Sequence, residues 1–282
     1  MKISPETYSA WSNNSSIRAL SSSGGLYSEI AKHLLEQGYA VVGARYREDC
    51  TVEHDIITEV GEIELLRGTK YVASDMSSIR EKMRKINKKI CFFGTPCQTA
   101  SVNADVKIDL VCRGIIPRTT YLAYLKELES FYESKVSEVE FKCKDFGWNF
   151  SHIKISFENG DVYLEKASKD PYIQGFVKHN ILMKPCCFQC KFRGENRFSD
   201  ITIGDFWGYK DPLGVSLAIV RTEQGKRIFD SLRIHKKLES YKKALSHNRC
   251  LEESPKEHPK RKEFLELLKT KSFTDAYEEC IR

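Results

Sequence analysis

The chain has 282 residues, 41% hydrophobic and 30% charged, and its 45 basic and 39 acidic residues give a net charge of +6. These values are ordinary for a globular protein that buries a core in one large domain or two small ones. No apolar run approaches the ~20 residues of a membrane span, and residues 1–16 lack the apolar core of a secretory signal, so we expect a cytoplasmic protein. The basic excess lies in segments such as 80–89 and 256–263, without the exposed aromatic residues or known module of a nucleic-acid-binding protein.

The first half of the chain alternates helical and strand-like patterns. Apolar residues at helical spacing predict three helices, at 25–38, 74–87 and 119–134. Short apolar runs predict four strands, at 39–47, 53–60, 90–94 and 106–112. This alternation predicts an α/β fold, with a mixed, largely parallel sheet flanked by helices.

The pattern changes after residue 135. Three further strands are expected at 136–144, 151–158 and 161–167, followed by a strand at 215–222, a helix at 223–233 and a helix at 261–270. We interpret residues 1–245 as a single domain whose β-rich insert, at about 136–214, carries a cysteine loop. Residues 246–282 then form a polar helical tail.

Ten cysteines are many for a chain of this kind, and they favour metal or redox chemistry over a secreted disulfide scaffold. Cys187 and Cys190 form a C-x-x-C pair, a spacing that lets two thiolates bind one metal from one loop. Cys97 follows the expected strand 90–94, and Cys112 closes the strand 106–112. If these strands are parallel, both thiols lie at the carboxyl edge of the sheet, where α/β proteins bind ligands.

Four thiolates in one place suit zinc or an iron–sulfur cluster. The wide separation of the cysteines along the chain favours the cluster, as does the basic character of the neighbouring residues, Lys184, Lys191, Arg193 and Arg113. For Cys97 and Cys112, the alternative is that they are buried structural cysteines. Cys186 adjoins Cys187 and is the alternative ligand there, but the C-x-x-C spacing favours Cys187. The remaining cysteines are expected to be small apolar or surface residues: Cys50, Cys91, Cys143, Cys250 and Cys280.

The stretch SSSGG at 21–25 precedes a predicted helix. A helix mouth with free amides binds anions, and glycines let a ligand approach the backbone, although simple N-capping by one serine is the alternative. Weaker candidates are Lys70 and Tyr71, which could meet a phosphate and a ring, and Asp205 with Trp207, which could line a pocket for a flat ring. Packing is the alternative for these residues.

The motifs SSSGG, RGTKYV, FFGTPCQ, LVCRG, CFQCKF and SDITIGDFWG occur in this order over roughly residues 5–235. Together they resemble the beta-subunit family of coenzyme F-420 hydrogenases and dehydrogenases. The resemblance implies an iron–sulfur flavoprotein oxidoreductase that passes electrons between a 4Fe–4S cluster, FAD and a small acceptor or donor. It implies cluster ligands at Cys97, Cys112, Cys187 and Cys190. It also implies contacts with FAD at a second set of positions, Ser22, Ser23, Gly24, Gly25, Lys70, Gly94, Thr95 and Gln98.

This sequence also departs from the family's pattern. Residues 1–49 contain no cysteine, whereas many relatives begin with a ferredoxin-like segment, so a separate ferredoxin-like redox protein is the expected partner. Arg113 stands where histidine is expected in many relatives. The small-molecule substrate is open, because bacterial members of such families also act in other pathways, including surface-polysaccharide synthesis. No residue is identified as a proton donor.

Two other functions remain open on the sequence alone. One is a non-catalytic accessory or binding protein whose fold is stabilised by a zinc ion or a cluster bound to four cysteines. The other is a thiol–disulfide protein that uses Cys187 and Cys190, although such pairs usually open a helix in a thioredoxin-like unit.

Overall fold

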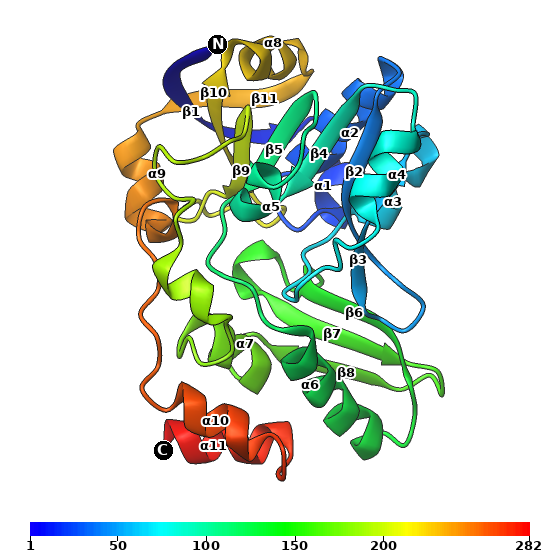
Figure 1. Ribbon diagram of the computed structural model, residues 1–282, viewed down its shortest axis with the longest axis vertical. Helices are drawn as coiled ribbons and strands as arrows, with labels where there is room; N and C mark the ends of the chain where they lie inside the picture. Colours follow the sequence, from blue (N-terminus) through cyan, green and yellow to red (C-terminus); the bar gives the residue numbers. More distant parts are fainter.

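The computed structural model describes residues 1–282 apart from the side chain of Phe150. Two sheets form two parts of the molecule, with the amino terminus at the large sheet and the carboxyl terminus beside the small one (Figure 1). The larger sheet has eight strands in the order β11-β1-β10-β9-β5-β4-β2-β3. Their bounds, in chain order, are β1 Lys2–Ser12, β2 Ala40–Tyr46, β3 Val52–Ile57, β4 Ile90–Gly94, β5 Val106–Leu110, β9 Ile201–Asp205, β10 Ser216–Thr222 and β11 Ile234–Glu239.

The expected mixed α/β sheet is confirmed. Strands β2, β4, β5 and β9 pair in parallel and form its centre, while β3 at one edge and β10, β1 and β11 at the other are antiparallel. The carboxyl ends of the four parallel strands therefore meet at one edge of the sheet, which faces the smaller part of the molecule (Figure 1).

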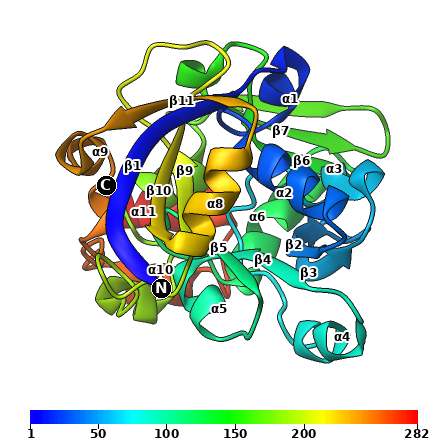
Figure 2. The ribbon, with the colours of Figure 1, turned by 90° about the horizontal axis from the view of Figure 1, so that it is seen from above.

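Helices cover both faces of this sheet. On one face lie α2 (Leu26–Glu36) and α8 (Glu223–Ser231), seen above the strands in Figure 2. Leu26, Ile30 and Leu34 recur at helical spacing, and they pack on buried side chains of the sheet. On the other face lie two short helices, α4 (Ile79–Lys85) and α9 (Tyr241–His247).

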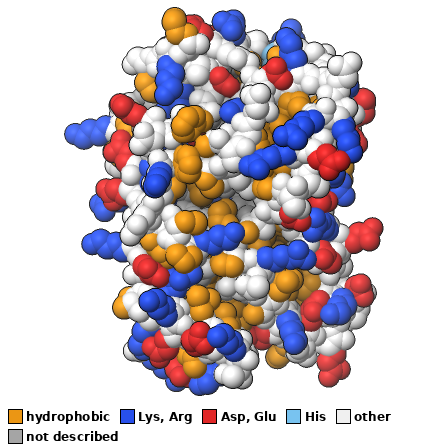
Figure 3. Space-filling model, viewed as in Figure 1, with side chains coloured by type: hydrophobic (Ala, Val, Ile, Leu, Met, Phe, Trp, Pro, Cys, Tyr) orange, Lys and Arg blue, Asp and Glu red, His pale blue; other side chains and the backbone are white. Residues whose placement is uncertain are grey.

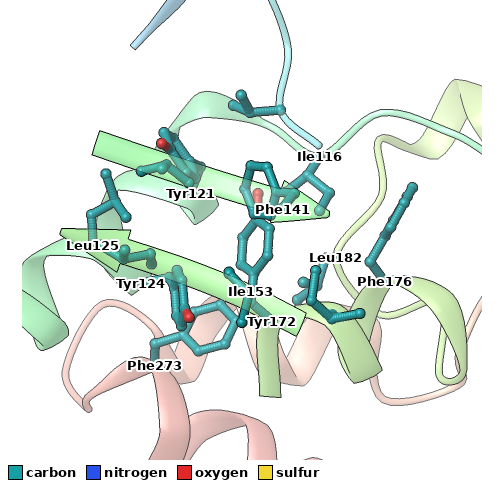
Figure 4. Close-up of a cluster of buried hydrophobic side chains, with 14 of the residues drawn as sticks. Ile116, Tyr121, Tyr124, Leu125, Phe141, Ile153, Tyr172, Phe176, Leu182 and Phe273 are labelled. Carbon is teal, nitrogen blue, oxygen red and sulfur yellow. The ribbon is translucent and has the colours of Figure 1, made fainter. Parts of the chain in front are cut away.

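The smaller sheet has the order β6-β7-β8, all antiparallel. Its strands and the helices packed on it are β6 Val136–Cys143, β7 His152–Phe157, β8 Val162–Lys166, α6 Arg118–Phe131, α7 Pro171–Val177, α10 Arg261–Leu267 and α11 Phe273–Ile281. Aromatic side chains fill the core between them (Figure 4). Tyr124 stacks on Tyr172 with ring centroids 4.8 Å apart, and its hydroxyl donates to the buried Asp170 carboxylate over 2.7 Å.

The remaining elements are short helical segments. They are α1 Ser15–Leu20, η1 Val60–Glu62, α3 Ile63–Leu66, α5 Pro96–Ala100, η2 Trp148–Phe150, η3 Pro185–Gln189 and η4 Arg249–Leu251. Among the described residues, no helix has both the length and the apolar character needed to cross a bilayer.

Three details differ from the sequence-based expectations. The helix expected at 74–87 begins only at Ile79, because Asp75 is held beside β3 by backbone bonds to Val52 and His54. Residues 201–205, within the range given to the insert, form a parallel strand of the large sheet. The antiparallel strands of the insert end at Lys166, the last residue of β8.

The tail is also more than a polar appendage. Phe264, Phe273 and Ala276 are fully buried in the aromatic core of the smaller part. These three side chains extend the aromatic core into the tail, for which the sequence predicted only a polar, solvent-exposed helix.

Candidate functional site

The carboxyl edge of the large sheet carries two of the predicted ligands. Strands β4 and β5 are parallel, with Gly94 opposite Asp109 in the register. Cys97 lies in the first turn of α5, directly after β4, and Cys112 lies two residues beyond β5. The predicted placement of both thiols at one sheet edge is therefore confirmed.

The C-x-x-C loop reaches the same place from the smaller part of the molecule. Burial raises the pKa of the Cys112 thiol, and the thiols of Cys97, Cys187 and Cys190 raise it further, so each of these three lies within electrostatic range of Cys112. Cys186 acts in the same way on the pKa of Cys187, which burial raises to about 11. Among the described residues, however, no three or more Cys, His, Asp or Glu side chains already form a metal-binding arrangement.

The sulfur atoms already have polar neighbours. The Ile115 amide donates to Cys187 Sγ over 3.3 Å, and the Thr95 hydroxyl lies 3.3 Å from Cys97 Sγ. Gly114 lets the two cysteine-bearing segments pack closely, because a Cβ there would clash with Met183 Sδ. Hydrogen bonds to sulfur, such as that from the Ile115 amide to Cys187, are among the features by which proteins adjust the reduction potentials of iron–sulfur clusters.

A buried arginine joins the thiol-bearing segments. The Arg193 guanidinium donates to the carbonyl oxygens of Cys112 at 3.1 Å, of Arg113 at 3.0 Å and of Cys250. Its Nε donates to the Ser254 hydroxyl over 3.1 Å. The side chain therefore ties three distant stretches of the chain together beside the thiols.

A cavity of about 700 Å³ lies along the same edge of the sheet, within the range of roughly 300–1,000 Å³ that ligand sites occupy. Exposed apolar side chains lie across the middle of the molecular face seen in Figure 3, with lysine and arginine side chains beside them. The wall is basic, with five cationic residues against the single acid Asp205: Arg67, Lys70, Arg113, Lys142 and Arg249. Such a wall favours an anionic ligand.

Most residues predicted to contact a flavin do line this cavity, namely Ser22, Ser23, Gly25, Lys70, Tyr71, Gly94, Thr95, Gln98 and Asp205. Gly24 lies behind the wall, where its amide donates to the Ser216 hydroxyl over 2.9 Å. Cys112 also lines the cavity. Cys112 therefore belongs both to the group of four thiols and to the cavity wall.

The serine–glycine stretch does not cap α2. The N-cap residue is Gly25 at φ +93°, and no side chain accepts a hydrogen bond from the first turn. Ser22 Oγ instead accepts from the Thr69 amide over 2.8 Å, and the Ser23 hydroxyl donates to Val215 O over 2.9 Å. The N-capping alternative is thus wrong, and the first-turn amides of α2 have no intrahelical acceptor.

Lys70 extends over the end of α3. Its ammonium donates to the carbonyl oxygens of Arg67 at 2.7 Å and of Gly68 at 3.1 Å, and it lies 5.3 Å from the Tyr46 ring centroid. Burial lowers the pKa of Lys70 to about 7, which makes its charge sensitive to a bound anion.

The polar groups of Thr95 and Gln98 already have hydrogen-bond partners within the protein. The Thr95 amide donates to Gln98 Oε1 over 2.9 Å, and Gln98 Nε2 donates to the Ser74 hydroxyl over 2.8 Å. The two residues form a capping box for α5, so their side chains fix the helix that carries Cys97.

Asp205 meets a partner that sequence reasoning missed. Lys142, on β6 of the smaller sheet, forms a buried ion pair with the Asp205 carboxylate and lies 4.8 Å from the Trp207 ring centroid. Trp207 in turn stacks on Trp148, with centroids 4.9 Å apart. No sequence signal links β6 to β9, because the pairing depends on how the two sheets dock.

The stretch 246–250 was also missed, and it forms one wall of the cavity. The Asn248 side-chain amide donates to Asp205 O over 3.1 Å, and Arg249 is exposed at the wall. Sequence reasoning had placed it at the start of the polar tail.

The chain matches two protein-family models. Both models describe the beta subunit of coenzyme F420 hydrogenase/dehydrogenase, and the amino-terminal one matches residues 7–80 while the carboxyl-terminal one matches residues 87–244. The chain belongs to this family. The resemblance noted in the sequence is confirmed, and the F420 hydrogenase/dehydrogenase beta-subunit family is a family of oxidoreductase subunits.

Individual relatives agree with this assignment. The F subunit of the F(420)H(2) dehydrogenase of Methanosarcina mazei is 25% identical over 225 residues, which cover 76% of this chain and 59% of the relative. This beta-subunit-family chain thus spans about three fifths of that protein's length. In fold, it resembles a chain of the F420-reducing NiFe hydrogenase complex of Methanosarcina barkeri, with a TM-score of 0.59 and 18% identity over 97% of this chain and 90% of the other.

Proposed function

We propose that this chain is an iron–sulfur flavoprotein oxidoreductase subunit that holds FAD in the 700 Å³ cavity and one 4Fe–4S cluster on Cys97, Cys112, Cys187 and Cys190. Electrons would pass between a separate redox protein and a small molecule. The observation that carries this proposal is the position of Cys112, which is shared by the thiol group and the cavity wall.

The donor set fits a cluster. Four thiols approach from three segments, and Cys97 is exposed while Cys190 is half-buried, which leaves both side chains room to turn toward a common centre. The buried Arg193 beside them suits a centre that four thiolates make anionic.

The cavity fits a dinucleotide cofactor. The mouth of α2 and the cations at positions 67 and 70 suit a pyrophosphate, since helix amides and basic side chains bind phosphate oxygens. The rings of Trp207, which is stacked on Trp148, and of Tyr71 line the cavity and suit contact with a planar ring system.

When bound, the cluster would exchange single electrons, and the flavin would combine two of them for transfer to a small molecule. The residues of this chain would bind, orient and shield these groups. The ion pair with Asp205 fixes the position of the Lys142 ammonium. Lys70 is readily protonated beside an anion, because its pKa is about 7. Either cation can therefore stabilise negative charge that accumulates on a reduced ring.

Anaerobic purification tests the proposal. We expect a brown protein with about four iron and four sulfide per chain and with bound or bindable FAD. Serine substitution of each predicted ligand should remove most of the iron, whereas the exposed neighbour Cys186→Ser should retain it.

The other outcomes are distinct. A colourless zinc protein without flavin would favour the accessory-protein alternative, and a metal-free protein with a reversible disulfide would favour thiol–disulfide exchange. Loss of iron in Cys186→Ser but not in Cys187→Ser would exchange the roles of those residues. Coenzyme F420, which the relatives' names contain, is the first acceptor to assay with the loaded protein.

A further inference from the structure

Arg193 carries a buried charge that the protein itself does not balance. The side chain is 8% exposed, and its hydrogen bonds go to three carbonyl oxygens and one hydroxyl. Within the part of the chain that the structure describes, no carboxylate lies within 4.0 Å of its guanidinium. These bonds use four of the five N–H donors of the guanidinium and leave its charge uncompensated, and an unpaired buried cation is costly.

Hydrogen bonds place this charge beside the thiols. Arg193 bonds the backbone oxygen of Cys112, and the Ser254 hydroxyl that accepts from Arg193 also accepts from the Cys190 amide over 3.1 Å. The next residue, Gly194, donates to Leu251 O over 2.8 Å. Arg193 thus connects two of the predicted ligand segments and lies close to both.

We propose that Arg193 is the fixed counter-charge of the cluster and the positioning residue that holds the Cys112 and Cys190 segments around it. This inference rests on the proposed function. Reduction adds one electron to an already anionic centre, so a fixed neighbouring cation stabilises the reduced form more than the oxidised form and raises the reduction potential.

Two substitutions separate charge from shape. Arg193→Lys keeps the positive charge but loses the planar fork that reaches several carbonyl oxygens together, whereas Arg193→Gln keeps hydrogen-bond donors but loses the charge. Lys256→Gln is the matched control, because Lys256 lies two residues beyond Ser254, the hydroxyl partner of Arg193, and is exposed, where solvent screens its charge.

The measurement is an anaerobic redox titration of the reconstituted proteins, followed by electron paramagnetic resonance of the reduced cluster, together with iron content and far-UV circular dichroism. We expect Arg193→Gln to lower the equilibrium constant for cluster reduction at least tenfold, which is about 59 mV for one electron. Arg193→Lys should keep most of the wild-type potential with a lower iron content. Lys256→Gln should match the wild type.

An iron-replete Arg193→Gln protein at the wild-type potential would refute the counter-charge role alone. If Arg193→Gln takes up no iron, the cluster content and reduction potential of Arg193→Lys test the counter-charge role instead. A cluster at the wild-type potential in Arg193→Lys supports the role, and a folded Arg193→Lys protein without a cluster refutes it, because charge would then not suffice. Absence of iron from the wild type would refute the proposed function and, with it, this inference.

Discussion

The sharpest structural prediction concerns Gly24, the residue of the serine–glycine stretch that lies behind the cavity wall. A Cβ at this position would lie 2.7 Å from Ala10 O and 2.8 Å from Ser216 N. Both atoms belong to the backbone of paired strands, β1 and β10, in which Ala10 lies opposite Ser216. Neither can rotate aside, so Gly24→Ala must displace the stretch or separate the strands.

The magnitude follows from this geometry. Ordinary contacts of a Cβ begin at 3.4 Å, so the shortfall against Ala10 O is 3.4 − 2.7 = 0.7 Å. Overpacking of this kind costs about 1–3 kcal/mol, and displacement of the Gly24 amide from the Ser216 hydroxyl costs about 1 kcal/mol more. The entropy that alanine removes from the unfolded chain offsets about 0.4–1 kcal/mol. We expect a net loss of about 1–3.6 kcal/mol in the free energy of unfolding.

Equilibrium urea unfolding of Gly24→Ala measures this loss, with Gly61→Ala as the control. Gly61 has nothing within 4 Å of the added Cβ and no left-handed φ, so its substitution should leave stability within about 0.5 kcal/mol of the wild type. Titration with FAD should also show weaker binding to Gly24→Ala, because Ser23 and Gly25 must move with it. A Gly24→Ala protein as stable as Gly61→Ala would refute the reasoning.

Three further predictions concern stability. Lys142→Met should cost about 3 kcal/mol in urea unfolding, because it leaves the Asp205 carboxylate without its buried cation, and the double variant with Asp205→Asn should recover part of the loss. The pKa of Lys70 is about 7 in the folded protein, below the usual 10.5, so the unfolded state binds more protons between these values. Its contribution to stability should therefore rise from pH 7 to pH 10, and the difference between wild type and Lys70→Met in urea unfolding should follow that rise. Gly225→Ala should lower the thermal midpoint of unfolding, because its Cβ would clash with Asp200 O, and an unchanged midpoint would contradict this packing.

The sequence was informative where local pattern and chain direction suffice. The apolar runs 90–94 and 106–112 predict buried strands, and the parallel arrangement then brings Cys97 and Cys112 to one edge without knowledge of any contact. The same holds for the helix expected over 25–38, which ends at Glu36 with Gln37 as its C-cap and Gly38 in the left-handed region.

It was uninformative where long-range pairing decides the structure. Strand β1 has a mixed burial pattern and was not predicted, since its polar residues alternate irregularly and its partners β10 and β11 lie some 200 residues later. Strand β9 joins the large sheet through its parallel pairing with β5, which no local signal distinguishes from the strands of the insert. The Lys142–Asp205 pair and the wall at 246–250 depend on the same docking.

Charge is the feature that connects the fold to its proposed ligands. In the cavity wall, Arg67 pairs with Glu64 and Lys142 pairs with Asp205, whereas the described residues offer no carboxylate within 4.0 Å of Lys70, Arg113 or Arg249. Arg193 repeats this pattern beside the thiols. A fold that gathers more cations than acids at one sheet edge loses stability through the repulsion and desolvation of the unpaired cations, and bound anions remove that loss. Occupancy by an anionic cofactor and an anionic metal centre should therefore stabilise the protein by more than their contact area alone implies, because each ligand also supplies the missing countercharge.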